Sequence, residues 1–134
     1  MEKQTTIKNK ITLKGKGLHT GKFVEVNILP SVADSGIVFK RVDLENPVLI
    51  KADAEAVTET SRGTTIEAKG AKVSTIEHLM AALYASNIDN ALIEINGEEV
   101  PILDGSSKYW LEAIEKSGVE ELEKERKYFT LKEI

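Results

Sequence analysis

The segment "STIEHLMAALYASNIDN", residues 74–90, is the clearest helical stretch of the chain, and it contains one of only two histidines. Ser74 and Glu77 fit the S-x-x-E capping box, in which each side chain satisfies a free backbone N–H at a helix start. The apolar side chains that follow recur at helical spacing: Ile76, Leu79, Met80 and Leu83. This pattern predicts an amphipathic helix that begins at Ser74 and stops near Asn87.

The residues before this helix have the alternation of short strands. Apolar residues at Ile11 and Leu13 precede a glycine-bearing turn, "GKGLHTG" (15–21), and alternation resumes after it. The second alternating set is Val24, Val26 and Ile28. Further strands are predicted at residues 36–42, 47–52, 64–68 and 71–74, the last two joined by a tight turn at Lys69-Gly70.

The residues after the helix predict a hairpin and a second helix. Asn96-Gly97 lies between apolar runs, and this dipeptide is the strongest short hairpin signal because both residues tolerate positive φ. Residues 103–107, "LDGSS", are typical of a turn. Ser106 or Ser107 would then cap a helix that runs to about Ser117 and is ended by Gly118. Its inner side chains would be Trp110, Leu111 and Ile114.

The last part of the chain is strongly charged and then apolar. We interpret "VEELEKERK" (119–127) as a linker, and "YFTLKEI" (128–134) as a strand. A strand needs a partner for its backbone groups. It either pairs back onto the preceding residues or opens a second domain that is missing here. The predicted organisation is a first domain over residues 1–118, followed by a linker and opening strand over 119–134.

Composition limits the classes of function. The 134 residues carry a net charge of −4, with scattered lysines, which does not indicate a nucleic-acid-binding surface. The absence of cysteine excludes disulfides and thiolate metal sites. No apolar run approaches the length of a membrane span. The first residues lack the apolar core of a signal peptide, so we expect a cytoplasmic protein.

Glu77 and His78 allow two interpretations. In one, Glu77 completes the capping box and His78 is an ordinary helix residue. In the other, a carboxylate base stands beside a metal ligand. Catalytic zinc usually takes three protein ligands, and the chain has no H-E-x-x-H pair, because His19 lies in a distant loop. A zinc site would therefore need ligands from elsewhere. The loop around His19 also lacks the spacing of a phosphate-binding motif.

Three ordered stretches carry a specific resemblance: "GKGLHTG" (15–21), "VSTIEHLMAALYASNIDNALIEI" (73–95) and "EVPILDGSS" (99–107). Together with "SGIVFKRVDL" (35–44) and "GTT" (63–65), they resemble the first half of UDP-3-O-acyl-N-acetylglucosamine deacetylases, the LpxC family. These are zinc enzymes of lipid A synthesis in Gram-negative bacteria. The resemblance covers essentially the whole chain, and the combination of motifs is far more specific than any one of them.

The resemblance implies an α+β fold, a two-layer sandwich in which a mostly antiparallel or mixed sheet packs on two helices. It also implies a second domain of similar fold, which would supply an H-K-x-x-D helix with two zinc ligands and a histidine that protonates the leaving amine. Those parts are absent from this chain, so we expect the chain alone to be inactive. The expected partners are UDP-3-O-acyl-N-acetylglucosamine and the missing C-terminal domain.

Roles for individual residues also follow from the resemblance. His78 would bind Zn²⁺, and Glu77 would be the general base that takes a proton from the metal-bound water. Asp104 would orient a catalytic group. Thr60 and Gly63 belong to a segment bordering the substrate channel, and Gly63 stands where some members carry a larger residue; His19 would be peripheral. A different class stays open: a non-catalytic binding or scaffold domain on the same fold, with Glu77 and His78 as structural residues.

Overall fold

The structure, a computed structural model, describes residues 2–60 and 63–126. Within these residues the strands are β1 (Lys3–Ile7), β2 (Ile11–Lys16), β3 (Phe23–Leu29), β4 (Ile37–Arg41), β5 (Val48–Lys51), β6 (Val57–Glu59), β7 (Thr65–Ala68), β8 (Ala71–Val73), β9 (Ala91–Ile95) and β10 (Val119–Glu125). The helices are α1 (Glu77–Ala85), α2 (Lys108–Ser117) and a short 3₁₀ helix, η1 (Ala54–Ala56). In the described residues neither α-helix is long and apolar enough to cross a membrane.

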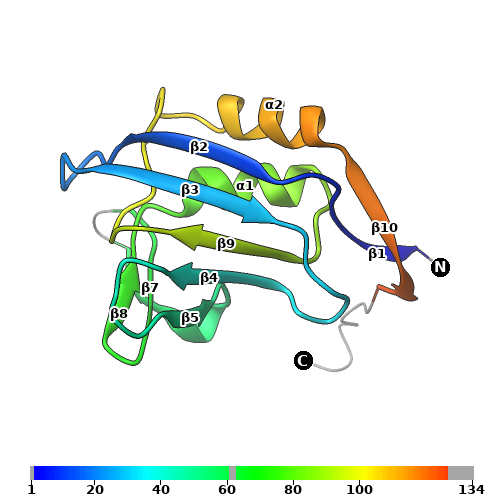
Figure 1. Cartoon of the computed structure of the whole chain (residues 1–134), viewed down its shortest axis with the longest axis horizontal. Coiled ribbons are helices and arrows are strands. Elements are labelled where there is room, and N and C mark those ends of the chain that lie inside the picture. The colour runs from blue at the N-terminus through cyan, green and yellow to red at the C-terminus, as the bar shows by residue number, and fades with distance from the viewer. Residues whose placement is uncertain (1, 61–62, 127–134) are drawn as a thin grey trace.

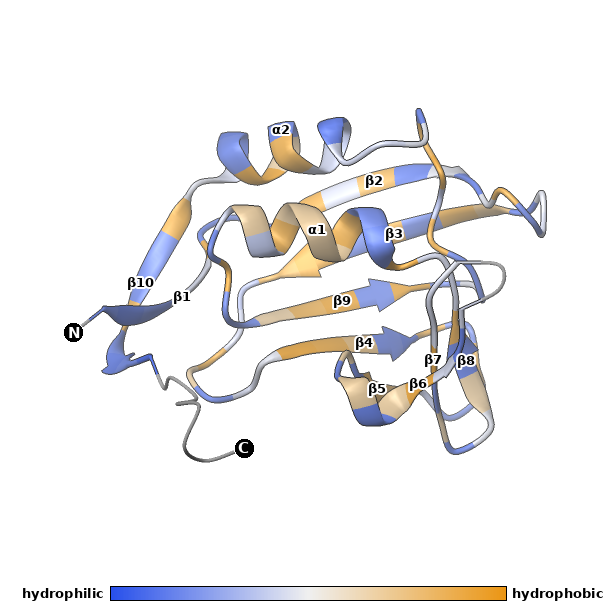
Figure 2. Cartoon of the chain, turned by 180° about the vertical axis from the view of Figure 1, so that it is seen from behind, coloured by the Kyte–Doolittle hydropathy of each residue, from blue (hydrophilic) through white to orange (hydrophobic). Residues whose placement is uncertain are grey.

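The main layer is a five-stranded mixed sheet in the order β2-β3-β9-β4-β5. All its neighbours run antiparallel except β4 and β9, which are parallel. Helices α1 and α2 form the second layer, with α1 lying across one face of the sheet and α2 beside it near β2 (Figures 1 and 2). This arrangement confirms the predicted α+β sandwich with a mixed sheet packed on two helices.

The alternation in the sequence explains which face of the sheet is covered. Alternate residues of β3 and β9 are buried, and five of these side chains belong to the hydrophobic core: Val26, Ile28, Ala91, Ile93 and Ile95. The helices contribute Leu79, Leu83, Trp110 and Ile114. Each fully buried large apolar side chain stabilises the fold by about 1.5–3 kcal/mol before entropy costs are counted. This core holds the start of α1 against the sheet.

A three-stranded sheet, β6-β7-β8, lies beside the main sheet and leads directly into α1. The turn between β7 and β8 is the predicted Lys69-Gly70 pair, and both residues have positive φ, as a type I′ turn requires. Ile66 and Val73 pair across the two strands and are buried in the shared core. The small sheet is therefore packed firmly enough to position the residues on either side of it.

The predicted linker at residues 119–127 is wrong for most of its length. Residues Val119–Glu125 form β10, which pairs antiparallel with β1 (Figure 1). Most side chains of β10 are exposed to solvent, so a strand at this position can consist largely of charged residues. The high charge of the segment therefore did not indicate a linker. Arg126 follows β10 and binds Asp89. The predicted strand at 128–134 lies outside the described residues.

The predicted hairpin at Asn96-Gly97 is also wrong. Strand β9 ends at Ile95, and its partners are β3 and β4, which are distant in sequence. The Asn96 side chain accepts a hydrogen bond from Glu25 N at 2.8 Å, and Gly97 packs so closely on Val24 that an added Cβ would lie 2.5 Å from its Cγ1. Contacts with β3 therefore replace the local turn that the dipeptide favours.

Candidate functional site

Helix α1 begins at Glu77 rather than at the predicted Ser74. The residue before it, Ile76, is the N-cap and makes no side-chain capping bond. The N–H and the hydroxyl of Ser74 both donate to the carbonyl of Glu98, so Ser74 belongs to a bridge with the segment after β9. The capping-box prediction is therefore wrong, because Ser74 is held by a sheet-like pairing and cannot turn toward the helix.

The carboxylate of Glu77 is held by the segment before β7. The N–H of Thr64 donates to Glu77 Oε1 at 3.0 Å. Gly63 has a φ of +85°, and a Cβ added there would lie 2.9 Å from Glu77 Oε2. The backbone of Gly63 and Thr64 thus wraps the carboxylate closely, and only glycine leaves this space open. The structure brings Gly63 and Glu77 together, two residues that the sequence analysis singled out separately.

His78 is half-buried in the first turn of α1. Its backbone carbonyl accepts a hydrogen bond from the Ser107 hydroxyl at 2.8 Å, which ties the first turn of α1 to the residue before α2. Within residues 2–60 and 63–126, no group forms a hydrogen bond with the His78 imidazole. The ring nitrogens are therefore available for a ligand, while the backbone of the residue is fixed.

Asp104 is exposed in the turn before α2. Its carboxylate accepts hydrogen bonds from the N–H and hydroxyl of Ser106, and in the described chain its bonds stay within this turn. The Ser106 hydroxyl holds the pKa of Asp104 below its ordinary value. Asp104 therefore remains ionised, but it does not contact Glu77 or His78 through a hydrogen bond.

The remaining predicted site residues lie around the same end of the molecule. His19 is exposed and lines a hollow of about 240 Å³. The other lining residues are Thr20, Glu59, Thr65, Lys72, Ser74 and Glu98. Thr60 is exposed next to this hollow's Glu59, and Gly63 contacts Glu77 as described above. His19 and the β6–β8 sheet therefore border a shared polar surface.

The sequence analysis missed Glu99, which is fully buried. Its carboxylate accepts hydrogen bonds from Thr20 N at 2.8 Å, from His19 N at 3.1 Å and from the Thr75 hydroxyl at 2.7 Å. Burial raises the pKa of Glu99, but the bonds from Thr20, Thr75 and His19 together outweigh it and leave the pKa lowered. A signal was present in the apolar residues after Glu99, which indicate that the segment enters the core.

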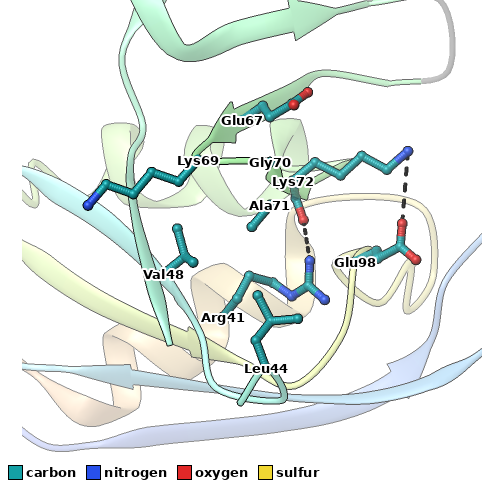
Figure 3. Close-up of a pocket in the computed structure, with 9 residues that line it drawn as sticks. All are labelled: Arg41, Leu44, Val48, Glu67, Lys69, Gly70, Ala71, Lys72 and Glu98. Atoms are coloured by element: carbon teal, nitrogen blue, oxygen red, sulfur yellow. Dashed lines mark hydrogen bonds and ion pairs between the residues drawn. The ribbon is translucent and has the colours of Figure 1, made fainter. Parts of the chain in front are cut away.

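Another pocket, with a volume of about 480 Å³, lies between the two sheets (Figure 3). It is lined by residues of both charges: Arg41, Leu44, Val48, Glu67, Lys69, Gly70, Ala71, Lys72 and Glu98. Arg41 donates to the carbonyl of Lys72 at 2.8 Å and is paired through two bonds with Asp43. The Arg41 guanidinium is therefore already engaged by protein groups, and neither Glu77 nor His78 lines this pocket.

The residues at the start of α1 fit part of a metal site. An imidazole without a protein partner is a good zinc ligand, and an adjacent carboxylate suits proton transfer from metal-bound water. Among the described residues, however, no group of three or more histidine, cysteine, aspartate or glutamate side chains could hold a metal ion. His78 and Glu77 therefore supply fewer groups than the three protein ligands usual for catalytic zinc.

Comparisons with known proteins agree with these motifs. The LpxC family, described as UDP-3-O-acyl N-acetylglycosamine deacetylase, matches residues 4–134. A UDP-3-O-acyl-N-acetylglucosamine deacetylase of Geotalea uraniireducens is 50% identical over 129 residues, which cover 96% of this chain and 42% of the relative. The bifunctional enzyme LpxC/FabZ of Bacteroides thetaiotaomicron is 48% identical over 132 residues, covering 98% of this chain and 29% of the relative.

A deacetylase of the same name from Xanthomonas campestris pv. campestris is 43% identical over 133 residues, which are 99% of this chain and 44% of the relative. The chain thus spans less than half the length of these three relatives. The family match extends over almost all of the sequence, including the start of α1 and the loop that contains His19. The chain belongs to the LpxC family of UDP-3-O-acyl N-acetylglycosamine deacetylases.

Proposed function

We propose that this chain is the N-terminal domain of a zinc-dependent, cytoplasmic hydrolase that removes the N-acetyl group of UDP-3-O-acyl-N-acetylglucosamine in lipid A biosynthesis. The observation that carries the proposal is the start of α1, where the backbone of Gly63 and Thr64 holds Glu77 beside a His78 imidazole with no partner in the described chain. Family membership gives this pair its chemical context.

Each residue has a distinct task in the proposed reaction. Zinc, when bound, lowers the pKa of its water to about 7 and polarises the amide carbonyl. His78 contributes one imidazole ligand from a backbone that Ser107 fixes. Glu77 would accept the proton of the attacking water as general base. The Thr64 N–H engages Oε1, and the absent side chain of Gly63 keeps the space next to Oε2 open.

The proposed site is completed by a second domain. Because His78 is only one of the three protein ligands that catalytic zinc usually takes, the remaining zinc ligands and the acid that protonates the leaving amine come from residues beyond this domain. The first domain extends at least to Glu125, because β10 pairs with β1. Activity therefore requires the complete protein, and residues 1–134 alone are inactive.

We also propose that the substrate passes over the polar surface near His19, with Thr60 and Gly63 bordering its channel. The hollow there is lined by His19 and Lys72 together with the carboxylates of Glu59 and Glu98, so it offers hydrogen-bonding groups of both charges to a polar sugar nucleotide. Asp104 stays ionised in its turn and serves to orient a catalytic group of the second domain. The complete protein would thus bind its substrate between the two domains.

The test is a pair of substitutions in the complete natural protein, including whatever follows residue 134. Glu77→Gln should lower kcat by about 10²–10⁴-fold, the usual contribution of a general base, while zinc content is retained. His78→Ala should lower both activity and zinc content while circular dichroism shows a folded protein. Glu115→Gln, an exposed carboxylate on α2, is the control and should have wild-type activity.

A non-catalytic binding domain would respond differently. In that case His78→Ala would lower stability, and neither variant would change deacetylase activity or metal content. Wild-type protein that bound no zinc and released no acetate from the substrate would also contradict the proposal. Metal analysis and acetate release therefore decide between the enzyme and the binding domain.

A further inference from the structure

Glu99 is a charged side chain with no contact to solvent. Burying a carboxylate is costly unless hydrogen bonds replace its hydration. Here three donors do so: the N–H groups of His19 and Thr20 bind Oε1, and the Thr75 hydroxyl binds Oε2. The carboxylate therefore connects a surface loop with the residue that lies two positions before Glu77.

Thr75 is itself in an unusual conformation. It is buried and has a φ of +59°, a left-handed conformation that β-branched residues rarely adopt. Such a conformation costs about 1–3 kcal/mol and persists only where the surroundings enforce it. The left-handed turn at Thr75 changes the direction of the chain between β8 and α1, so it sets the direction in which α1 leaves the small sheet.

The backbone on both sides of Thr75 is pinned. Ser74 N donates to the carbonyl of Glu98, and Val100 N donates to the carbonyl of Ser74. Ile76 N donates to the carbonyl of Thr64. The only hydrogen bond of the Thr75 side chain in the described residues is the one to Glu99. Glu99 thus completes a set of restraints around the first residues of α1.

The loop at residues 17–20 closes onto the same carboxylate. A Cβ added at Gly17 would lie 2.3 Å from Glu99 Oε1, so the loop can approach only because residue 17 is glycine. His19 and Thr20 donate their N–H groups to Glu99 from this loop. One buried carboxylate therefore fixes both the loop that carries His19 and the turn that precedes Glu77 and His78.

We propose that Glu99 is a positioning residue for the deacetylation reaction: it holds Thr75 and the 17–20 loop together, and so places Glu77 and His78 relative to the substrate surface near His19. The inference rests on the proposed function, because it assigns Glu99 a task in that same site. Glu99 does not touch the reacting atoms. It acts through Thr75 on the start of α1.

The test compares variants of Thr75 in the complete natural protein. Thr75→Val keeps the shape and the β-branch but removes the hydroxyl that Glu99 accepts. We expect kcat to fall by about 10–100-fold, as for a small misplacement of catalytic groups, with KM changed less than about threefold and zinc content unchanged. Thr75→Ser keeps the hydroxyl and should recover most of the lost kcat.

Thr6→Val is a matched control. Thr6 is also buried, and its hydroxyl donates to Asn90 O and accepts from Ser31 N, so valine removes two hydrogen bonds there, against one at Thr75. It lies on β1, away from β7, β8 and the start of α1 (Figure 1). Thr6→Val should lower the unfolding temperature but leave kcat per folded molecule unchanged.

Glu99→Gln should lower kcat less than Thr75→Val does, because the amide of glutamine can accept hydrogen bonds from the loop and donate one to Thr75.

The outcomes separate this inference from the proposed function. If Thr75→Val lowers the unfolding temperature as Thr6→Val does and leaves kcat per folded molecule unchanged, Glu99 is only structural and the inference is overturned. If the wild-type protein has no deacetylase activity, the proposed function fails instead. NMR measures the effect of Thr75 on the start of α1 directly. The backbone amide signals of Glu77 and His78 should shift in Thr75→Val but not in Thr6→Val. Unchanged signals in Thr75→Val would overturn the inference.

Discussion

At the scale of single residues, Gly63 shows how a backbone conformation and the position of the Glu77 carboxylate depend on each other. Its φ of +85° favours glycine, and its missing side chain leaves room for Glu77 Oε2. We expect Gly63→Ala to lower stability by about 1–3 kcal/mol from strain in the left-handed conformation. In the complete protein it should also lower kcat, because the new methyl group would displace the Glu77 carboxylate.

Gly70→Ala is the control for this prediction. Gly70 has a similar φ of +78°, but nothing lies within 4 Å of its added Cβ. Gly70→Ala should therefore lower the free energy of unfolding in urea by a similar amount and leave kcat unchanged. Equal losses of kcat in the two variants would show that strain alone, and not contact with Glu77, determines the effect of residue 63.

The residues of the site were predictable from sequence to different degrees. Glu77 and His78 are adjacent in the chain, so their proximity needed no fold. The contact of Gly63 with Glu77 and the burial of Glu99 depend on how β7, β8 and the segment after β9 come together. Sequence alone does not encode such contacts locally, and a glutamate is normally exposed. The sequence therefore does not reveal the burial of Glu99, although this residue begins the segment 99–107 that carries the family resemblance.

At the scale of elements, the structure at the start of α1 predicts a smaller loss of stability on replacing Ser74 than the capping-box motif does. A capping serine contributes about 1 kcal/mol. Among the described residues, the Ser74 side chain instead makes only a 3.3 Å bond to Glu98 O, a carbonyl that Ser74 N already engages. We expect Ser74→Ala to change the free energy of unfolding by less than about 0.5 kcal/mol, the usual range for a surface substitution.

Urea denaturation followed by circular dichroism checks this value. Asn90→Ala serves as a positive control, because the buried Asn90 amide binds Gln4, Thr5 and Gly36 and its loss should be clearly measurable. A loss near 1 kcal/mol for Ser74→Ala would show that Ser74 caps α1 in solution.

The strands that sequence predicted are those with one buried face. Strands β2, β3, β4, β5, β7 and β8 carry the pattern because burial on one side imposes it. The pair β1 and β10 was not predicted, since β10 is exposed on both faces and its sequence resembles a solvated linker. The hairpin predicted at Asn96-Gly97 is wrong for a different reason. The dipeptide favours a local turn, but β9 pairs instead with β3 and β4, which are distant in sequence.

At the scale of the whole molecule, Arg41 joins the two sheets that surround the site. It lies on β4 in the main sheet, and its guanidinium donates to the carbonyl of Lys72 on β8. Asp43 binds the other side of the guanidinium through two hydrogen bonds of 2.8–2.9 Å. Since β8 precedes α1, this bond ties the main sheet to the strand that leads to Glu77 and His78.

This connection should make stability depend on acid pH. The hydrogen bonds of Arg41 hold the pKa of Asp43 below its ordinary value. A carboxylate with a lowered folded pKa contributes stability above its unfolded pKa of about 3.9 and loses it as pH falls through the folded pKa. Asp43→Asn should therefore cost about 1–2 kcal/mol at pH 7 after allowance for partial exposure, and the difference from wild type should shrink below about pH 4.

Urea unfolding at pH 7 and at acid pH measures this difference, with Glu25→Gln as control. Glu25 pairs with Lys14 at 3.6 Å, but both side chains are partly exposed to solvent, so loss of this pair should change stability by less than about 0.5 kcal/mol at either pH. Glu99 also has a lowered pKa and adds to acid sensitivity in both proteins, so only the difference between variant and wild type isolates Asp43. If the difference stayed constant into acid, the stability lost in Asp43→Asn would come from packing rather than from the charge of Asp43. The two sheets would then be joined without help from the ion pair.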